Sequence, residues 1–302
     1  MSKKAELHYE GKVYELPILE GTEHEKALDI SKLRSQSGLI TLDSGFKNTG
    51  SCESAITFLN GEEGILRYRG YSIEDLAEKA SFLEVAYLLI FGELPTQEQL
   101  DKFYGDIKEE SHVDEEMKKI LDGFPKTAHP MGVLSSLTSA LIAFNPGSVN
   151  VDSEEDMYTA IVKLLAKFPV LVAWTLRKRN SKPLDYGDSS LNYVDNILKM
   201  MFKKPNEEYK VNAKVSEALN KLLILHADHE QNCSTSTVRI VGSSHAGLFA
   251  SISAGISALW GPLHGGANQA VIEMLEGIKE DGGDTKKYMQ KAKDKEDPFR
   301  LM

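Results

Sequence analysis

The sequence has few cysteines, no excess of positive charge and no long apolar run. Its 302 residues include two cysteines, Cys52 and Cys233, without CxxC spacing, which argues against a disulfide framework or structural zinc and favours a reducing compartment. The net charge of −10 predicts no diffuse attraction to nucleic acid or an acidic membrane. No apolar signal segment follows the N-terminal lysines, and no run approaches the ~18 apolar residues of a membrane span. We therefore expect a cytoplasmic protein with no nucleic-acid or membrane partner.

The pattern of apolar residues changes once along the chain. From residue 5 to about 45, segments such as AELHYEGKVYELPIL and GLITLDSGF carry β-formers punctuated by Gly and Pro, which is typical of hairpins. From Ile73 onward apolar residues recur at helical spacing, and Ser72 with Asp75 predicts an N-terminal cap. Further helical stretches mostly end in Gly, Asn or Pro. The sequence predicts a mainly α fold behind a short β-rich N-terminal region.

Small side chains are concentrated in the helix predicted over residues 243–259. Alanines repeat every four residues beside two glycines and a serine, at Ala246, Ala250, Ala254, Ala258, Gly247, Ser251 and Gly255. Small residues at this spacing let neighbouring backbones approach closely. We expect a central, tightly packed helix in a core or at an interface.

Two histidines follow an apolar helix in LNKLLILHADHEQN. His226 and His229 continue the helical spacing of Leu219 and Leu222, so both are predicted to point inward near the helix C-terminus. There they are either satisfied core histidines or donors to a substrate carboxylate. A metal site at His226, Asp228 and His229 is a further alternative, although HExxH spacing is absent.

Two other polar residues in the following segment are weaker candidates. Arg239, which follows a Ser/Thr run, is predicted to be buried and either binds a carboxylate or forms a structural pair. His245 is interpreted as structural.

A third histidine, His264, lies in LWGPLHGGANQA. Pro262 cannot continue the preceding helix and a new helical pattern begins after Gly265 and Gly266, so His264 is predicted at or just before a helix N-terminus. The positive end of the helix dipole opposes protonation there, and a neutral imidazole can donate an N–H to a developing oxyanion. The two glycines allow a ligand to approach the backbone. A turn-capping histidine is the alternative.

HADHEQN (226–232) and GPLHGGANQA (261–270) together resemble the motifs of citrate synthase in residues and order. SGFKNTGSCESAITFLNGEEGILRYRGYSIEDLA is similar to the segment entering the large domain of the bacterial, Gram-negative-type enzymes with a β-rich N-terminal extension. The resemblance covers essentially all 302 residues.

The resemblance implies condensation of acetyl-CoA with oxaloacetate and water to citrate and CoA, with acetyl-CoA as a substrate and neither a tightly bound cofactor nor a metal. It identifies His264 as the catalytic, enol-stabilising histidine, and His229, His226 and Asn232 as substrate-binding residues. It also implies a homodimer or a hexamer.

The resemblance also implies three regions: a β-rich N-terminal region (1–47), a large helical domain (48–264) and the start of a small helical domain (265–302). Family members continue after DKEDPFRLM with a GFGHR-like motif that carries a second catalytic histidine, then an aspartate base and arginines, whereas this sequence stops at Met302. We therefore expect the given polypeptide to bind oxaloacetate poorly, to catalyse little or nothing, and to expose apolar surface.

Other functions stay open at this point. Methylcitrate synthase shares the motifs and differs mainly in accepting propionyl-CoA. A non-catalytic assembly subunit of the same fold, or a metal-dependent hydrolase built on His226, Asp228 and His229, are the remaining hypotheses.

Overall fold

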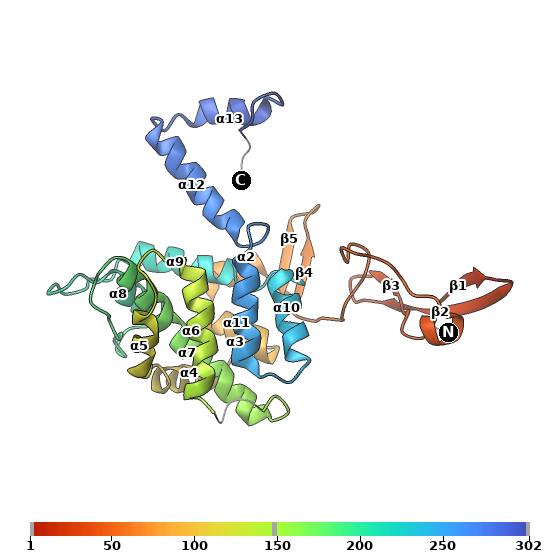
Figure 1. Cartoon of the computed structure of the whole chain (residues 1–302), viewed down its shortest axis with the longest axis horizontal. Helices are drawn as coiled ribbons and strands as arrows, with labels where there is room; N and C mark the ends of the chain where they lie inside the picture. The colour runs from red at the N-terminus through yellow and green to blue at the C-terminus, as the bar shows by residue number, and fades with distance from the viewer. Residues whose placement is uncertain (1–2, 147–149, 300–302) are drawn as a thin grey trace. The chain divides into compact units, whose positions relative to one another are not determined.

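The computed structural model describes residues 3–146 and 150–299. The chain divides into two compact units, with the boundary between Ala55 and Ile56. In the first unit, strands β1 (Lys4–Tyr9), β2 (Lys12–Glu20) and β3 (Lys26–Leu28) form an antiparallel sheet in that order (Figure 1). Glu10 and Gly11 both have positive φ, 49° and 73°, which is the backbone of a two-residue hairpin turn. Helix α1 (Leu33–Ser37) follows.

The hairpin predicted at GLITLDSGF is wrong, because residues 38–46 contain no strand. The Asp43 carboxylate instead accepts hydrogen bonds from the Lys47 and Asn48 backbones and from the Thr49 hydroxyl. The hydroxyl of Thr49 and these amides lower the pKa of Asp43. Such local side-chain bonds satisfy the backbone without a sheet partner, so the β-formers of this segment stay in a loop.

The second unit begins with a small sheet that the sequence did not predict and continues as helices, which confirms the mainly α fold. The sheet pairs β4 (Thr57–Asn60), β5 (Ile65–Tyr68) and β6 (Tyr71–Ser72). The helices are α2 (Ile73–Lys79), α3 (Phe82–Phe91), α4 (Gln97–Glu109), α5 (Glu116–Asp122), α6 (Pro130–Phe144), α7 (Glu154–Arg179), α8 (Tyr193–Phe202), α9 (Ala213–Leu225), α10 (Cys233–Gly242), α11 (Leu248–Leu259), α12 (Gly266–Glu280) and α13 (Thr285–Lys293).

Helix α7 is the central helix of the core. Within the described ranges it alone is long and apolar enough to cross a membrane by length and composition. Its Leu171 and Trp174 are nevertheless fully buried in the protein. Its buried Lys167 donates to the carbonyls of Glu110 and His112. A buried cation needs hydrogen-bond partners from the protein, and α7 has them for Lys167. This is the environment of a core helix in a folded domain.

Helix α11 is shorter than predicted. It begins at Leu248 rather than Ser243, because His245 (φ 59°) and Gly247 (φ 84°) have left-handed backbones that separate it from α10. The predicted close approach is confirmed: a Cβ on Gly255 would lie 2.6 Å from Cγ2 of Val238 in α10. On its other side α11 contacts α6, where the Ser253 hydroxyl donates to the Ser135 carbonyl (Figure 1).

Helices α12 and α13 contain no buried residue. Ile272 and Leu275 of α12 are more than half exposed, and Leu263 before it is fully exposed. The expected exposed apolar surface is therefore present in this part of the chain.

Candidate active site

His264 lies in a tight turn between α11 and α12, two residues before the first residue of α12, as the Pro and Gly pattern predicts. The turn is closed by backbone hydrogen bonds: the amide of Gly265 donates to the Leu259 carbonyl, and that of Gly266 donates to the Gly261 carbonyl. A Cβ on Gly265 would lie 2.4 Å from the Leu259 carbonyl oxygen, so only glycine fits there. The turn therefore presents His264 from a fixed backbone.

The half-buried imidazole of His264 contacts a hydroxyl that sequence reasoning missed. Nε2 of His264 lies 2.8 Å from Oγ of Ser234, which is the second residue of α10. The Ser234 hydroxyl also donates to the Gly255 carbonyl at 3.1 Å. The contact joins the start of α10 to the turn after α11, and no local sequence signal connects residues 30 positions apart.

Asn232 is the N-cap of α10. Its Oδ1 accepts from the Thr235 amide at 2.9 Å, and its Nδ2 donates to the His229 carbonyl at 3.3 Å. Both ends of this amide are therefore committed to the backbone. Asn232 thus holds the loop carrying His229 against the start of α10, next to Ser234.

The prediction that His226 and His229 point inward is wrong, because both are exposed. Helix α9 ends at Leu225, and His226 is its C-cap, with Nδ1 donating to the Leu222 carbonyl at 2.8 Å. The opposite face of α9 packs inward, because Asn220 bonds the Phe82 amide and the Ala80 carbonyl.

Asp228 has a structural role in the loop after α9. Its carboxylate accepts from the Thr57 hydroxyl at 2.5 Å and from the Glu230 amide at 3.0 Å. The Tyr68 hydroxyl donates to the Asp228 carbonyl at 3.0 Å. The loop that presents His229 is therefore fastened to the β4–β5 sheet, by residues that the sequence pattern did not indicate.

The other predicted site residues are not gathered here. Arg239 is exposed rather than buried and donates to Gln231. His245 pairs with Asp152 at 3.4 Å on the surface. Within the described residues no group of three His, Cys, Asp or Glu side chains could hold a metal ion.

The chain matches the family model for the citrate synthase C-terminal domain over residues 45–302. It is 51% identical over 302 residues to citrate synthase of Corynebacterium glutamicum, and 48% identical over 298 residues to citrate synthase 1 of Mycobacterium tuberculosis. These matches cover 100% and 99% of this chain and 69% of each relative. The chain belongs to the citrate synthase family.

Solved citrate synthase structures have the same fold. The enzyme of Pyrobaculum aerophilum aligns with a TM-score of 0.76 at 28% identity, over 94% of this chain and 67% of that one. The enzyme of Thermoplasma acidophilum, in a ternary complex with carboxymethyl coenzyme A and oxaloacetate, also gives 0.76, at 26% identity over 87% and 67%. That of Thermotoga maritima gives 0.69, at 31% identity over 83% and 64%. The chain thus spans about two thirds of the length of these relatives.

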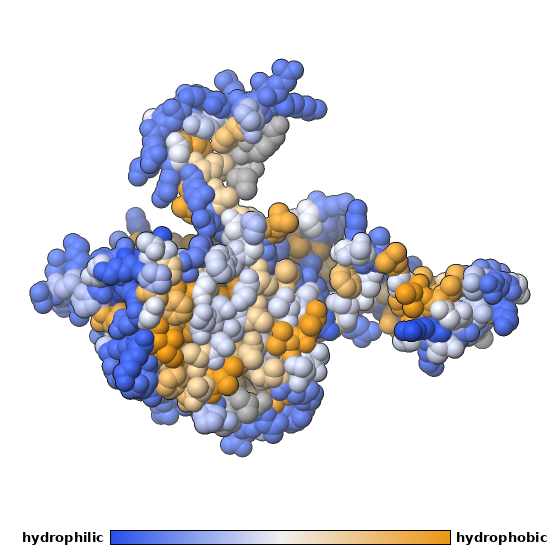
Figure 2. Space-filling model, viewed as in Figure 1, coloured by the Kyte–Doolittle hydropathy of each residue, from blue (hydrophilic) through white to orange (hydrophobic). Residues whose placement is uncertain are grey.

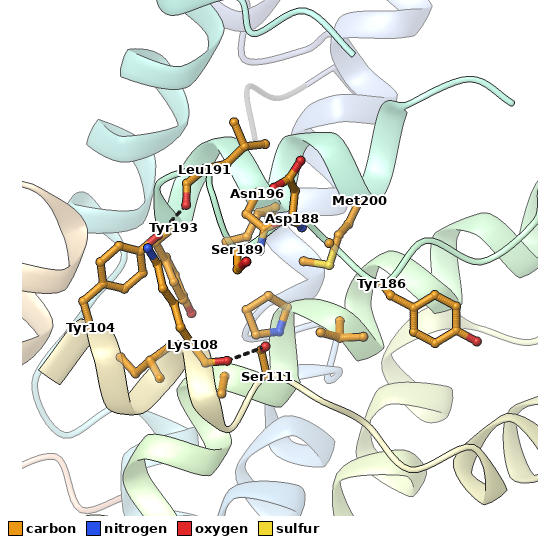
Figure 3. A pocket seen from close by; sticks show the side chains of 16 residues that line it. Tyr104, Lys108, Ser111, Tyr186, Asp188, Ser189, Leu191, Tyr193, Asn196 and Met200 are labelled. Atoms are coloured by element: carbon orange, nitrogen blue, oxygen red, sulfur yellow. Dashed lines mark hydrogen bonds between the residues drawn. The ribbon is translucent and has the colours of Figure 1, made fainter. Parts of the chain in front are cut away.

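A separate pocket of about 280 Å³ lies between α4, α7 and α8 and is lined by none of the predicted site residues of this citrate synthase family member (Figure 3). The Tyr104 hydroxyl donates to the Leu191 carbonyl and that of Tyr193 to the Leu165 carbonyl. Burial raises the pKa of Tyr104 to about 12 and raises that of Tyr193 as well. Both phenols stay protonated near neutral pH, so they supply no general base.

Proposed function

We propose that this chain takes part in the citrate synthase reaction, in which acetyl-CoA condenses with oxaloacetate and water to give citrate and CoA. His264 would donate a hydrogen bond to the enol of the thioester, and the exposed His229 and His226 would contact oxaloacetate. The observation that carries the proposal is the contact between His264 Nε2 and Ser234 Oγ, in a fixed turn ahead of α12. Asn232 would act indirectly, by holding His229.

The contact with Ser234 also bears on which nitrogen of His264 carries the proton. The hydroxyl has one hydrogen: it donates to the Gly255 carbonyl at 3.1 Å, and the same oxygen lies 2.8 Å from Nε2. For His264 to donate from Nδ1 to the enol, Nε2 must accept, so we infer that the hydroxyl hydrogen turns from the Gly255 carbonyl to Nε2 and that a neutral ring then carries its proton on Nδ1. No described side chain contacts Nδ1, which leaves this N–H for a developing enolate oxygen.

Nitrogen NMR of the ring tests this assignment. With ¹⁵N-histidine, His264 should show the Nδ1–H tautomer in the wild-type protein, and Ser234→Ala should shift it toward Nε2–H. His245→Asn removes a surface histidine whose partner is Asp152 rather than Ser234, and so helps to assign the spectrum. An Nε2–H tautomer in the wild type would contradict the inferred direction of the bond.

Thiol release from acetyl-CoA in the presence of oxaloacetate tests the reaction itself. Wherever thiol release is detected, we expect His264→Ala to lower it by about 10² to 10⁴-fold, as is usual for a catalytic hydrogen-bonding or acid–base group, and His245→Ala to leave it unchanged. The 302-residue polypeptide should turn over little, because His264 contacts no described carboxylate that could remove the acetyl proton. Full activity of that polypeptide would mean that a carboxylate within it acts as the base.

We also propose that the face formed by α6, α10 and α11 binds a second copy of the chain. Figure 2 shows mostly apolar and weakly polar side chains over these helices, with strongly hydrophilic ones around them. Ile240 of α10 is 72% exposed, and Ala250, Ala254 and Ala258 are half-buried along α11. An apolar face of low side-chain bulk suits close packing of helices from two copies.

Light scattering coupled to gel filtration tests this face. Ile240→Glu should convert a dimer or a larger assembly toward monomer, because a carboxylate would be buried without a partner. Val215→Glu, on the exposed face of α9, is the matched control and should leave the mass unchanged. A monomeric wild-type chain would overturn the proposal.

A further inference from the structure

His129 contacts both segments that flank His264. It is the N-cap of α6, and its Nδ1 accepts from the Met131 amide at 3.3 Å. Its ring stacks on that of Trp260, with centroids 4.9 Å apart and planes inclined by 22°. Its Nε2 lies 3.4 Å from Oε1 of Gln269. Trp260 precedes His264 by four residues, and Gln269 follows it by five.

The capping bond fixes the tautomer of His129. Because Nδ1 accepts from Met131, a neutral ring carries its proton on Nε2, which can then donate to Gln269. Gln269 is oriented for this contact, since its Nε2 donates to Glu273 at 2.7 Å and so turns Oε1 toward His129. The donors and acceptors of the three bonds are therefore mutually consistent: Met131 donates to His129, His129 to Gln269, and Gln269 to Glu273.

Trp260 is held on α6 as well as by His129. A Cβ on Gly132, in the first turn of α6, would lie 3.2 Å from the Trp260 ring, so the indole lies directly against the α6 backbone. The Trp260 amide donates to the Ile256 carbonyl in the last turn of α11. The side of the His264 turn that comes from α11 is therefore fixed to α6 through an aromatic ring.

The geometry points to His129 as a positioning residue that clamps the His264 turn at both ends, through Trp260 before it and Gln269 after it. Without the clamp, α12 has no buried residue to fix its direction, and the turn would be held only by its backbone bonds and by the Ser234 contact. His129 does not touch His264 itself. The inference deepens the proposed function, because it concerns the orientation of the proposed enol donor.

His129→Asn is the informative substitution, because asparagine is a good N-cap and preserves the start of α6 while removing the ring stack and the Nε2–H donor. In the 302-residue protein we expect hydrogen exchange at the amides of Gly265 and Gly266 to rise by at least about 5-fold, as for loss of one aromatic contact and one hydrogen bond. The ring signals of His264 should shift. Gln269→Ala, which replaces an exposed side chain of α12, should give a smaller increase in exchange.

Trp260→Phe keeps an aromatic ring against His129 and should restore most of the protection that Trp260→Ala loses. His245→Asn is the control histidine and should change neither readout. Unchanged exchange and unchanged His264 signals in both His129→Asn and Gln269→Ala would overturn the inference. These readouts need no turnover, so they stand apart from the thiol-release assay, whose failure would instead refute the proposed reaction.

Discussion

Replacing Gly255 by alanine should push α10 and α11 apart and weaken the fold. The new Cβ would lie 2.6 Å from Cγ2 of Val238, well inside van der Waals contact, and 3.6 Å from the Ser234 carbonyl oxygen. Valine is stiff at χ1, so Val238 cannot turn away cheaply and the helices must separate. The start of α10 carries Ser234, so the separation should also lengthen its contact with His264.

Two opposing terms set the size of the effect. Overpacking a close helix contact costs about 1–3 kcal/mol, whereas alanine in place of glycine inside a helix returns about 1 kcal/mol. We therefore expect Gly255→Ala to lower the free energy of unfolding by about 1 kcal/mol, with a range of about 0–2. Gly105→Ala in α4, where a Cβ would meet nothing within 4 Å, should instead raise it by about 0.5–1 kcal/mol.

Urea unfolding followed by circular dichroism measures both variants. The difference between them isolates the contact with Val238, because both gain the same helix propensity. Adding Val238→Ala to Gly255→Ala should recover part of the loss, as a coupling of about 0.5–3 kcal/mol between touching residues. The reasoning is refuted if Gly255→Ala stabilises the protein as much as Gly105→Ala does, or if Val238→Ala gives no recovery.

Two further predictions concern charges. Lys199 and Asp185 form a pair at 2.9 Å with side chains only 10% and 11% exposed, so Lys199→Met should lower the free energy of unfolding by about 3–5 kcal/mol by leaving a buried carboxylate without its cation; a loss below 1 kcal/mol, typical of a surface pair, would contradict this. Partial burial alone would raise the pKa of Asp106, but hydrogen bonds from Lys102 and Tyr158 outweigh it and hold the pKa below 3.8. The stabilisation is present above about pH 4 and lost as the pH falls through the lowered pKa, so the stability difference between wild type and Asp106→Asn should shrink on acidification, and a constant difference from pH 7 to 2 would rule it out.

Sequence spacing predicted most helices, because a helix is defined by local hydrogen bonds and by a face of apolar residues three and four apart. The Pro and Gly rules likewise placed His264 ahead of α12, since both act on the backbone of neighbouring residues. The β-formers of residues 38–46 predicted a hairpin that is absent, because the Asp43 side chain bonds the local backbone in place of a sheet partner.

Which face of a helix is buried, and which side chains it contacts, was decided only by the tertiary structure. The apolar spacing of α9 predicted an inward His226, but Asn220 bonds the backbone around Ala80 and Phe82 and turns the opposite face inward. The partner of His264 was equally hidden, because Ser234 is 30 residues away and the close approach of α10 and α11 at Gly255 brings it there. The sequence by itself therefore determined which residues could form helices, turns and a hydrogen-bond donor, whereas burial and side-chain partners depended on contacts between segments distant in the chain, for which local spacing holds no information.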